Sequence, residues 1–158
     1  MRIVSGEFKG RIIHPPAGFT LRPTTDIAKE SLFNILGNRY DFDELSVLDL
    51  FAGTGGISYE FLSRGVNEII CVDIHPKHVG FIDKTCRDLK CNNARVVRSD
   101  AFVFLKACTK QFDVIFADPP YDLKGIEQIP QLVFEKQLLK ANGVLIVEHA
   151  IETDLSAL

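Results

Sequence analysis

The chain has 158 residues, of which 46% are hydrophobic and 25% charged, and this composition fits one globular domain. No apolar run reaches the roughly 18 residues of a membrane-spanning helix, and the first residues lack the apolar stretch of a secretory signal. We therefore expect a cytoplasmic protein with no membrane partner, and the net charge of −3 argues mildly against nucleic acid as a partner.

The distribution of charge along the chain, however, is compatible with a polyanion such as nucleic acid. Residues 1–40 carry a net charge of +3, whereas residues 41–158 carry −6. A cationic end on an acidic body can hold a polyanion against one face, although a solvated surface strip has the same pattern. The basic residues of this end are Arg2, Lys9, Arg11, Arg22, Lys29 and Arg39. The chain thus divides into an N-terminal extension, residues 1–40, and a core, residues 41–158.

The extension predicts a small β-hairpin followed by an extended stretch to residue 22. Gly6 and Gly10 bracket the turn, and Pro15 stops the returning strand. A lone hairpin is marginal in water, so it must dock on the core. A helix is expected from the capping side chains at 24–26 to Gly37. Its apolar face would consist of Ala28, Leu32, Ile35 and Leu36.

Short apolar runs alternate with helical patterns throughout the core. Strands are expected over residues 47–51, 68–73, 95–99, 112–118 and 143–148, and helices up to 64, over 76–90 and 101–107, and over most of 125–140, with Pro130 as a potential break. This alternation indicates an α/β fold with a mostly parallel sheet and helices on both faces. Ligands of such sheets bind beyond the carboxyl ends of the strands.

The first expected strand leads into a glycine turn that opens a helix. Gly53 and Gly55 let the backbone approach a ligand closely, and the N–H groups at a helix start suit an anionic group. Ser58 stands where the dinucleotide-binding fingerprint has its third glycine, which weakens a nicotinamide interpretation. Asp49, inside an apolar strand, needs a partner, either the glycine loop or the ammonium group of a ligand.

Carboxylates also follow the second and third strands. Asp73 lies where a carboxylate can accept hydrogen bonds from ribose hydroxyls, which indicates a nucleoside ligand. Asp100 can accept a hydrogen bond from an adenine amino group while Ala101 contacts the ring. By itself, however, Asp100 fits the cap of the following helix better.

The fourth strand ends in Asp118-Pro119-Pro120-Tyr121. The two prolines make the turn rigid and remove two N–H donors, so a carboxylate and backbone carbonyls remain as acceptors. Such a group of acceptors suits an NH₂ that must be held and polarised, and the tyrosine ring can stack on a flat base. The four cysteines include no Cys-x-x-Cys pair and are expected as core residues or free thiols, without a metal site.

These motifs in this order resemble class I S-adenosylmethionine-dependent methyltransferases that act on exocyclic amines. Within that class the chain resembles the RsmD family over residues 1 to about 149. The resemblance is carried by Met1 to Gly6, Gly10-Arg11, Arg22 to Asp26, Glu30 to Leu36, Asp49 to Gly55 and Leu62 to Gly65. It implies a Rossmann-like fold with an N-terminal hairpin extension, and methyl transfer to N2 of a guanine in 16S ribosomal RNA.

The resemblance also implies residue roles. Asp118, Pro119, Pro120 and Tyr121 would hold the guanine. S-adenosyl-L-methionine, which leaves as S-adenosyl-L-homocysteine, would contact Thr24, Asp49, Phe51, Gly53, Gly55, Asp73, Ile74, Asp100 and Ala101. The RNA would contact Arg2, Lys9, Arg11 and Arg22. The expected partner is 16S RNA or the assembled small subunit, and the expected state is a monomer without metal.

Three alternatives stay open. An adenine-N6 or cytosine-N4 methyltransferase shares the Asp-Pro-Pro-Tyr box but usually carries a larger recognition region. A glutamine methyltransferase of proteins is expected to have asparagine as the first residue of the box. A nucleic-acid-binding module with an inactive pocket would not need Asp118 or Tyr121. The fold that the resemblance implies ends in an antiparallel strand pair, so we also expect a further C-terminal segment of about twenty residues.

Overall fold

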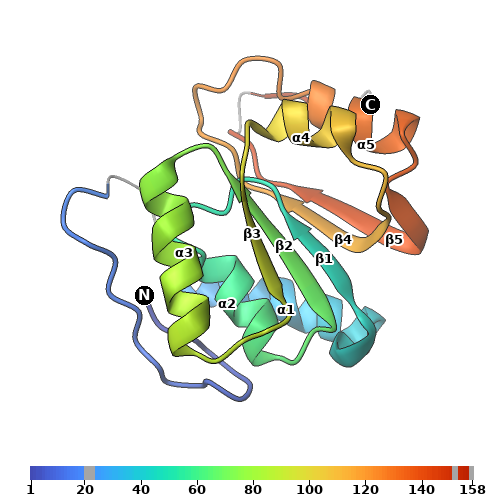
Figure 1. Cartoon of the computed structure of the whole chain (residues 1–158). Coiled ribbons are helices and arrows are strands. Elements are labelled where there is room, and N and C mark those ends of the chain that lie inside the picture. Colours follow the sequence, from blue (N-terminus) through green and yellow to red (C-terminus); the bar gives the residue numbers. More distant parts are fainter. Residues whose placement is uncertain (20–23, 151–152, 157–158) are drawn as a thin grey trace.

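The computed structural model describes residues 1–19, 24–150 and 153–156. Its centre is a five-stranded sheet in the order β3-β2-β1-β4-β5 with every neighbouring pair parallel (Figure 1). The strands are β1 (Ser46–Asp49), β2 (Glu68–Asp73), β3 (Ala94–Arg98), β4 (Phe112–Ala117) and β5 (Leu139–Val147). The predicted parallel sheet is thereby confirmed.

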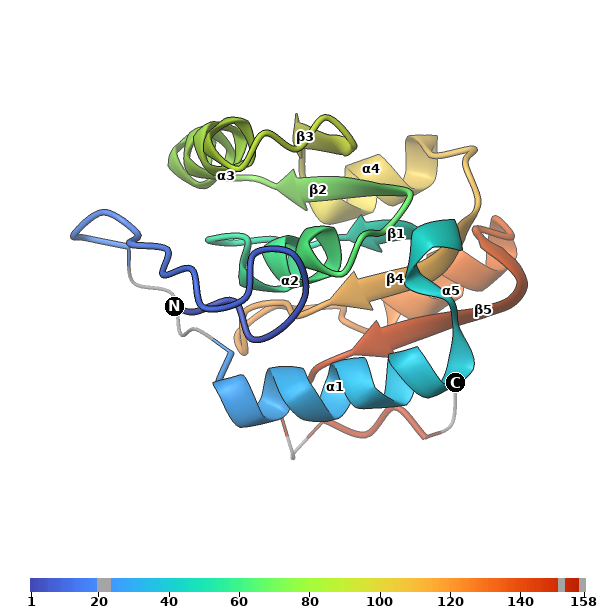
Figure 2. The same ribbon diagram turned by 90° about the horizontal axis from the view of Figure 1, so that it is seen from below.

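Helices cover both faces of this sheet (Figures 1 and 2). One face carries α1 (Asp26–Arg39), α2 (Gly56–Ser63) and α3 (Pro76–Asp88); the other carries α4 (Ala101–Ala107) and α5 (Gln128–Glu135), and a short 3-10 helix spans Phe42–Glu44. Pro130 lies near the start of α5 and causes no break inside it. Among the residues described, no helix is both long and apolar enough to cross a membrane.

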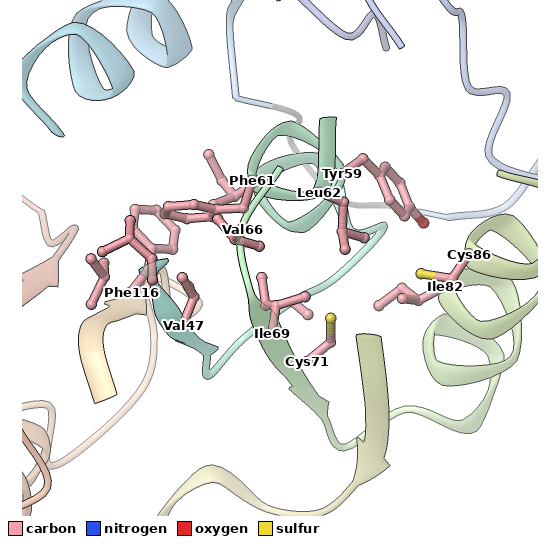
Figure 3. Close-up of a cluster of buried hydrophobic side chains, with 14 of the residues drawn as sticks. Val47, Tyr59, Phe61, Leu62, Val66, Ile69, Cys71, Ile82, Cys86 and Phe116 are labelled. Carbon is pink, nitrogen blue, oxygen red and sulfur yellow. The ribbon is translucent and has the colours of Figure 1, made fainter. Parts of the chain in front are cut away.

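The alternation of side chains along the strands explains why both faces are covered. Val47 belongs to the core under α1, α2 and α3, while its neighbour Leu48 belongs to the core under α4 and α5. Figure 3 shows the first of these cores, in which Phe61 of α2 gathers with Val47 and Phe116 of the strands. Because β1 has apolar partners on both sides, its residues are all buried.

The sheet reverses its strand order between β1 and β4, and this point positions the candidate site. The two strands are paired from Val47↔Val114 to Asp49↔Phe116, so their carboxyl ends lie side by side. The turn after β1 stays close to the sheet, because the Leu50 N–H donates to the Phe116 carbonyl at 2.9 Å and the Ala52 N–H to the Val72 carbonyl at 2.9 Å. Ligands of open α/β sheets bind at such a switch point.

The predicted N-terminal hairpin is present but minimal. A single antiparallel bridge joins Arg2 and Ile12, and the loop between them docks on α2. There the Glu7 N–H donates to the Ser63 carbonyl at 2.8 Å, and the Phe8 N–H to the Ser63 hydroxyl at 2.9 Å. These contacts supply the docking that an isolated hairpin of this size needs.

A buried carboxylate, Glu60 of α2, ties the extension to the core. It accepts the N–H groups of Val4 and Ser5 at 2.8 and 3.2 Å, and it pairs with Lys29 at 3.5 Å and Arg64 at 3.1 Å. The Glu60 side chain is fully buried, and a charge in that position is tolerated because cations and backbone donors surround it.

The structure corrects the predicted buried face of α1. The buried residues of the helix are Lys29, Phe33 and Leu36, whereas Ile35 is 67% exposed. The helix also continues through Gly37 to Arg39. The apolar pattern misses this face because its first buried position is Lys29, which pairs with Glu60 and donates to the Arg2 carbonyl.

The docked loop makes a sharp prediction for Gly6. Its φ is +90°, and an added Cβ would lie 2.1 Å from the Ser63 carbonyl oxygen. Gly10 in the same loop has φ +85° and open space around it. We expect Gly10→Ala to cost about 1–2 kcal/mol for its backbone alone, and Gly6→Ala to cost roughly 3 kcal/mol because the backbone must also move. Urea denaturation measures both, and equal losses would contradict the docked loop.

Candidate functional site

A cavity of about 660 Å³ opens at the carboxyl ends of the strands. This volume suits a small organic ligand. The cavity combines residues of the N-terminal extension, the glycine loop and the ends of β1, β2, β3 and β4. Its lining includes Met1, Thr24, Lys29, Asp49, Phe51, Gly53, Asp73, Ile74, His75, His78, Asp100, Ala101, Asp118, Pro119, Pro120 and Tyr121.

The cavity therefore brings together nearly all of the residues that the sequence singled out for cofactor and base. Gly55 is the exception, because it does not belong to the lining. It is the residue before α2, with φ +89°, and an added Cβ would lie 2.4 Å from the Tyr59 ring. Glycine is therefore required at position 55 both by the positive φ of the turn and by the close packing of the Tyr59 ring.

Asp49 is the most unusual group in the site. It is fully buried; its Oδ2 accepts the Ser58 hydroxyl at 2.7 Å, and within the described residues its Oδ1 has no hydrogen-bond partner. Burial raises the pKa of Asp49 to about 7, opposed by the Ser58 hydrogen bond and reinforced by Asp118 and Asp73. A buried carboxylate oxygen without a partner at a cavity wall suits a cationic ligand group.

Asp73, at the end of β2, already has three protein contacts. Its Oδ2 accepts the Gly53 N–H at 2.9 Å, and its Oδ1 accepts the His75 N–H at 2.9 Å and lies 3.0 Å from Nδ1 of His78. The contact with Gly53 joins the glycine loop to β2. Since a carboxylate offers about four acceptor positions, room for a ligand hydroxyl remains.

The two histidines were not predicted. His75 is the residue before α3 and His78 lies in the first turn of that helix, which brings the His78 ring back to Asp73. The only sequence signal is their spacing of two and five residues after a strand-end carboxylate. Ligand atoms of Asp73, His75 and His78 lie within 4.8 Å of one another, as a metal site would need, but Asp73 and His78 already bond each other directly.

Asp100 caps α4, which is the role that the sequence favoured for this residue considered by itself. Its Oδ1 accepts the N–H groups of Phe102 at 2.9 Å and Val103 at 3.0 Å. The residue also lines the cavity beside Ala101 and Ile74. Ile74 is 52% exposed, so this part of the wall offers apolar surface to a flat ring.

The Asp-Pro-Pro-Tyr segment begins directly after β4. Asp118 is half-buried and Pro119 buried, whereas Tyr121 is 63% exposed at the mouth of the cavity. The Leu123 N–H donates to the Pro120 carbonyl at 3.0 Å and closes a tight turn. A carboxylate inside the cavity and an exposed ring at its mouth can hold the edge and the face of a planar group together.

The extension reaches the site from the side of α3. Phe19 packs on His78 with the ring centroids 5.1 Å apart, and Thr24 and Met1 line the cavity. Lys9 and Arg11 are exposed on the hairpin, and Arg2 pairs with Asp26 at 2.8 Å. Arg22, the fourth predicted RNA contact, lies outside the described residues.

A second depression of about 550 Å³ lies at the opposite ends of the strands. Its lysines have acceptors in the protein: Lys110 contacts Glu68 at 2.6 Å, Lys140 contacts Asp113 at 3.5 Å, and Lys136 donates to the Lys106 carbonyl at 2.7 Å. It lacks the apolar walls of a small-molecule site, so the cavity at the carboxyl ends remains the candidate.

Comparison with known proteins shows the family to which the chain belongs. The family described as conserved hypothetical protein 95 matches residues 1–157. YlbH of Bacillus subtilis is 40% identical over 98% of this chain and 85% of its own length, and the ribosomal RNA small subunit methyltransferase D of Haemophilus influenzae is 35% identical over 94% and 78%. The solved structure of yhhF from Escherichia coli superposes with a TM-score of 0.87 at 32% identity, over 99% of this chain and 86% of that one.

Proposed function

Because this chain belongs to the RsmD-type family of methyltransferases, we propose that it transfers a methyl group from S-adenosyl-L-methionine to the exocyclic N2 amine of a guanine in 16S ribosomal RNA. One observation carries the proposal: Asp118 and Tyr121 line the same cavity as the buried Asp49 and the strand-end Asp73. In this proposal the Asp118–Tyr121 segment, which holds the amine, shares one cavity with the residues that bind the nucleoside.

The residues present fit this cofactor. Asp49, with a buried oxygen that lacks a protein partner among the described residues, accepts the ammonium group of the methionine part. Asp73 accepts a hydrogen bond from a ribose hydroxyl, and Ile74 and Ala101 contact the adenine, with Asp100 at its amino group. When bound, the cofactor supplies a methyl group activated by its positive sulfur, and S-adenosyl-L-homocysteine remains. No metal takes part in this proposal.

The Asp118 segment acts on the base. A guanine must leave its stack to reach the cavity, and Tyr121 receives its face. The exocyclic amine is a weak nucleophile because its lone pair is delocalised into the ring. Asp118 and the Pro119 carbonyl accept hydrogen bonds from its two N–H groups, which localises the lone pair and directs it toward the methyl group. After transfer the methylated nitrogen releases one proton, to Asp118 or to solvent. Fixing the two reactants in line supplies much of the rate enhancement.

The extension, residues 1–40, faces the RNA in this proposal, and residues 41–158 form the cofactor-binding core. Lys9 and Arg11 contact phosphates, and Arg2 and Arg22 are the further proposed contacts, of which Arg22 lies outside the described residues. The partner is 16S RNA or the assembled small subunit, which places the protein in the cytoplasm. It acts as a monomer, since one chain supplies both the amine-holding and the nucleoside-binding residues.

Removing the hairpin cations separates RNA binding from cofactor binding. We expect the double variant Lys9→Ala and Arg11→Ala to raise the KM for RNA by about tenfold or more and to flatten its salt dependence, since two phosphate contacts are lost. Calorimetry should give an unchanged cofactor Kd. The matched control, Lys136→Ala with Lys140→Ala, removes the same charge at the opposite ends of the strands. Equal increases in KM would contradict an RNA-facing hairpin.

The substrate class is tested by transfer of a tritiated methyl group to small-subunit particles, to protein-free 16S RNA and to duplex DNA. The proposal expects labelled 16S RNA in at least one of the first two samples and unlabelled DNA. Labelled DNA would favour an adenine-N6 or cytosine-N4 methyltransferase instead. Binding of RNA without transfer to any sample would favour an inactive binding module.

A further inference from the structure

Ser58 has a contact that the proposed reaction does not use directly. It lies on α2 at the position where the dinucleotide fingerprint has its third glycine, and it is fully buried. Its hydroxyl donates to Asp49 Oδ2 at 2.7 Å and accepts the thiol of Cys71 at 3.2 Å. A glycine there would offer Asp49 no side-chain donor, so the serine gives this chain an extra polar link behind the cavity.

This link leaves the two Asp49 oxygens in different states. Oδ2 is bound from behind by Ser58, whereas Oδ1 has no partner among the described residues, and the residue lines the cavity. A carboxylate bound on one oxygen is restricted in its rotation, and the other oxygen is then presented in one orientation. Placing and orienting a functional group through such a supporting contact is a general feature of binding sites.

We propose that Ser58 is a positioning residue for the cofactor, which keeps Asp49 ionised and oriented toward the ligand's ammonium group and so determines the lowest pH at which the cofactor binds. This inference rests on the proposed function, since it requires that Asp49 holds the ammonium group. It goes beyond that function because it assigns a pH range to the site and a residue that controls it.

The charges around Asp49 show why one hydroxyl matters. Burial, Asp118 and Asp73 all raise its pKa, and the Ser58 hydrogen bond lowers it. Cys71 and Tyr59 stay neutral at physiological pH because burial raises their pKa as well. Lys29 lines the same cavity, but it pairs with Glu60. Among the described residues, Ser58 is thus the group that favours the ionised form of Asp49.

The inference predicts a specific pH profile for ligand affinity. Below about pH 7 Asp49 becomes protonated, and the affinity for an ammonium ligand falls with an acid limb. At more alkaline pH the ligand's own ammonium group loses its charge, which gives an alkaline limb that is common to all variants. Removing the Ser58 hydroxyl should move the acid limb upward by about one pH unit, the size of a hydrogen bond to a charged group.

The test is calorimetric titration with S-adenosyl-L-homocysteine between pH 5.5 and 9. This ligand keeps the ammonium group but lacks the sulfonium charge, so its affinity reports on the ammonium contact without a sulfonium contribution. Ser58→Ala should bind about fivefold more weakly at pH 7 with its acid limb shifted upward, and Ser58→Cys, with a weaker donor, should lie between it and the wild type. The ligand 5′-methylthioadenosine keeps the adenosine part but lacks the α-ammonium group, so it should show no acid limb from Asp49.

Ser63→Ala is the matched control. Ser63 is a buried serine of the same helix, but its hydroxyl donates to the Ser5 carbonyl at 2.6 Å and does not contact Asp49. We expect it to lower the melting temperature without moving the acid limb. The same acid limb in Ser58→Ala and the wild type would overturn the role of Ser58 while leaving cofactor binding intact. No binding of either ligand to the wild type at any pH would overturn the proposed function itself.

Discussion

Replacing Asp118 with alanine is expected to lower kcat by about a thousandfold or more, whereas the affinity for the cofactor should change by less than about threefold. The asymmetry follows from where the residue lies. Asp118 contacts the target amine in the proposed reaction, but the polar groups assigned to the cofactor are Asp49, Asp73 and Asp100. Single-turnover transfer of tritiated methyl and calorimetry with S-adenosyl-L-homocysteine measure the two quantities separately.

Asp122 provides the control for this result. It is an exposed carboxylate four residues after Asp118 in the same turn region, and it does not line the cavity. Asp122→Ala should keep kcat within about twofold of the wild type, since surface substitutions away from the site have small effects. A kcat for Asp118→Ala within tenfold of the wild type would exclude Asp118 as the group that holds the amine.

The second large effect is expected at Asp49. Asp49→Asn should weaken cofactor binding by about 10- to 100-fold, because a buried charge-assisted hydrogen bond is lost. The same variant should be more stable than the wild type at pH 8 without ligand. The pKa of Asp49 is about 7 in the folded protein and about 3.8 in the unfolded chain, so the folded state binds the proton more tightly.

The sign of the pH dependence follows from that difference. Between about pH 4 and pH 7 the folded protein retains a proton that the unfolded chain has lost, so its free energy of unfolding falls as the pH rises, by a few kcal/mol in total. Asparagine carries no charge and removes this decline. Urea denaturation at pH 5 and pH 8 compares the two proteins. An equal pH dependence in wild type and Asp49→Asn would show that Asp49 is not a strained buried carboxylate.

These two carboxylates separate binding from chemistry. Asp49 should affect Kd and stability, and Asp118 should affect kcat, although both lie at the point where the strand order reverses. In this proposal the protein without ligand tolerates an unfavourable buried carboxylate at Asp49, and the ligand's ammonium group compensates for it on binding. Stability sacrificed at a binding site in this way is common in proteins.

Much of the fold was predictable because it depends on local rules. Buried parallel strands form continuous apolar runs, and their carboxyl ends must share one edge, so Asp49, Asp73 and Asp118 could be expected to lie together. Expected strand ends agree with the structure within about one residue at β2 and β4, whereas β5 begins at Leu139 rather than at 143. The early beginning of β5 depends on the pairing of Leu139 with Phe112, which composition does not encode.

The missed features depend on contacts between distant segments. Nothing local to Lys29 predicts its burial, because that burial requires Glu60, 31 positions further along the chain. His78 reaches Asp73 only because α3 begins at Pro76 and turns back over the end of β2. The Tyr59 ring that excludes a side chain at Gly55 is likewise visible only in the packed helix. The antiparallel strand pair expected after β5 stays a prediction.

The most direct test of the account is the identity of the modified nucleoside. Small-subunit particles that lack this modification are incubated with S-adenosyl-L-methionine and either the wild type or Asp118→Ala, and the 16S RNA is then digested and analysed by mass spectrometry. The account predicts N2-methylguanosine with the wild type and a loss of about a thousandfold in its rate of formation with Asp118→Ala. N6-methyladenosine, N4-methylcytidine or an unmodified digest from the wild-type reaction would contradict it.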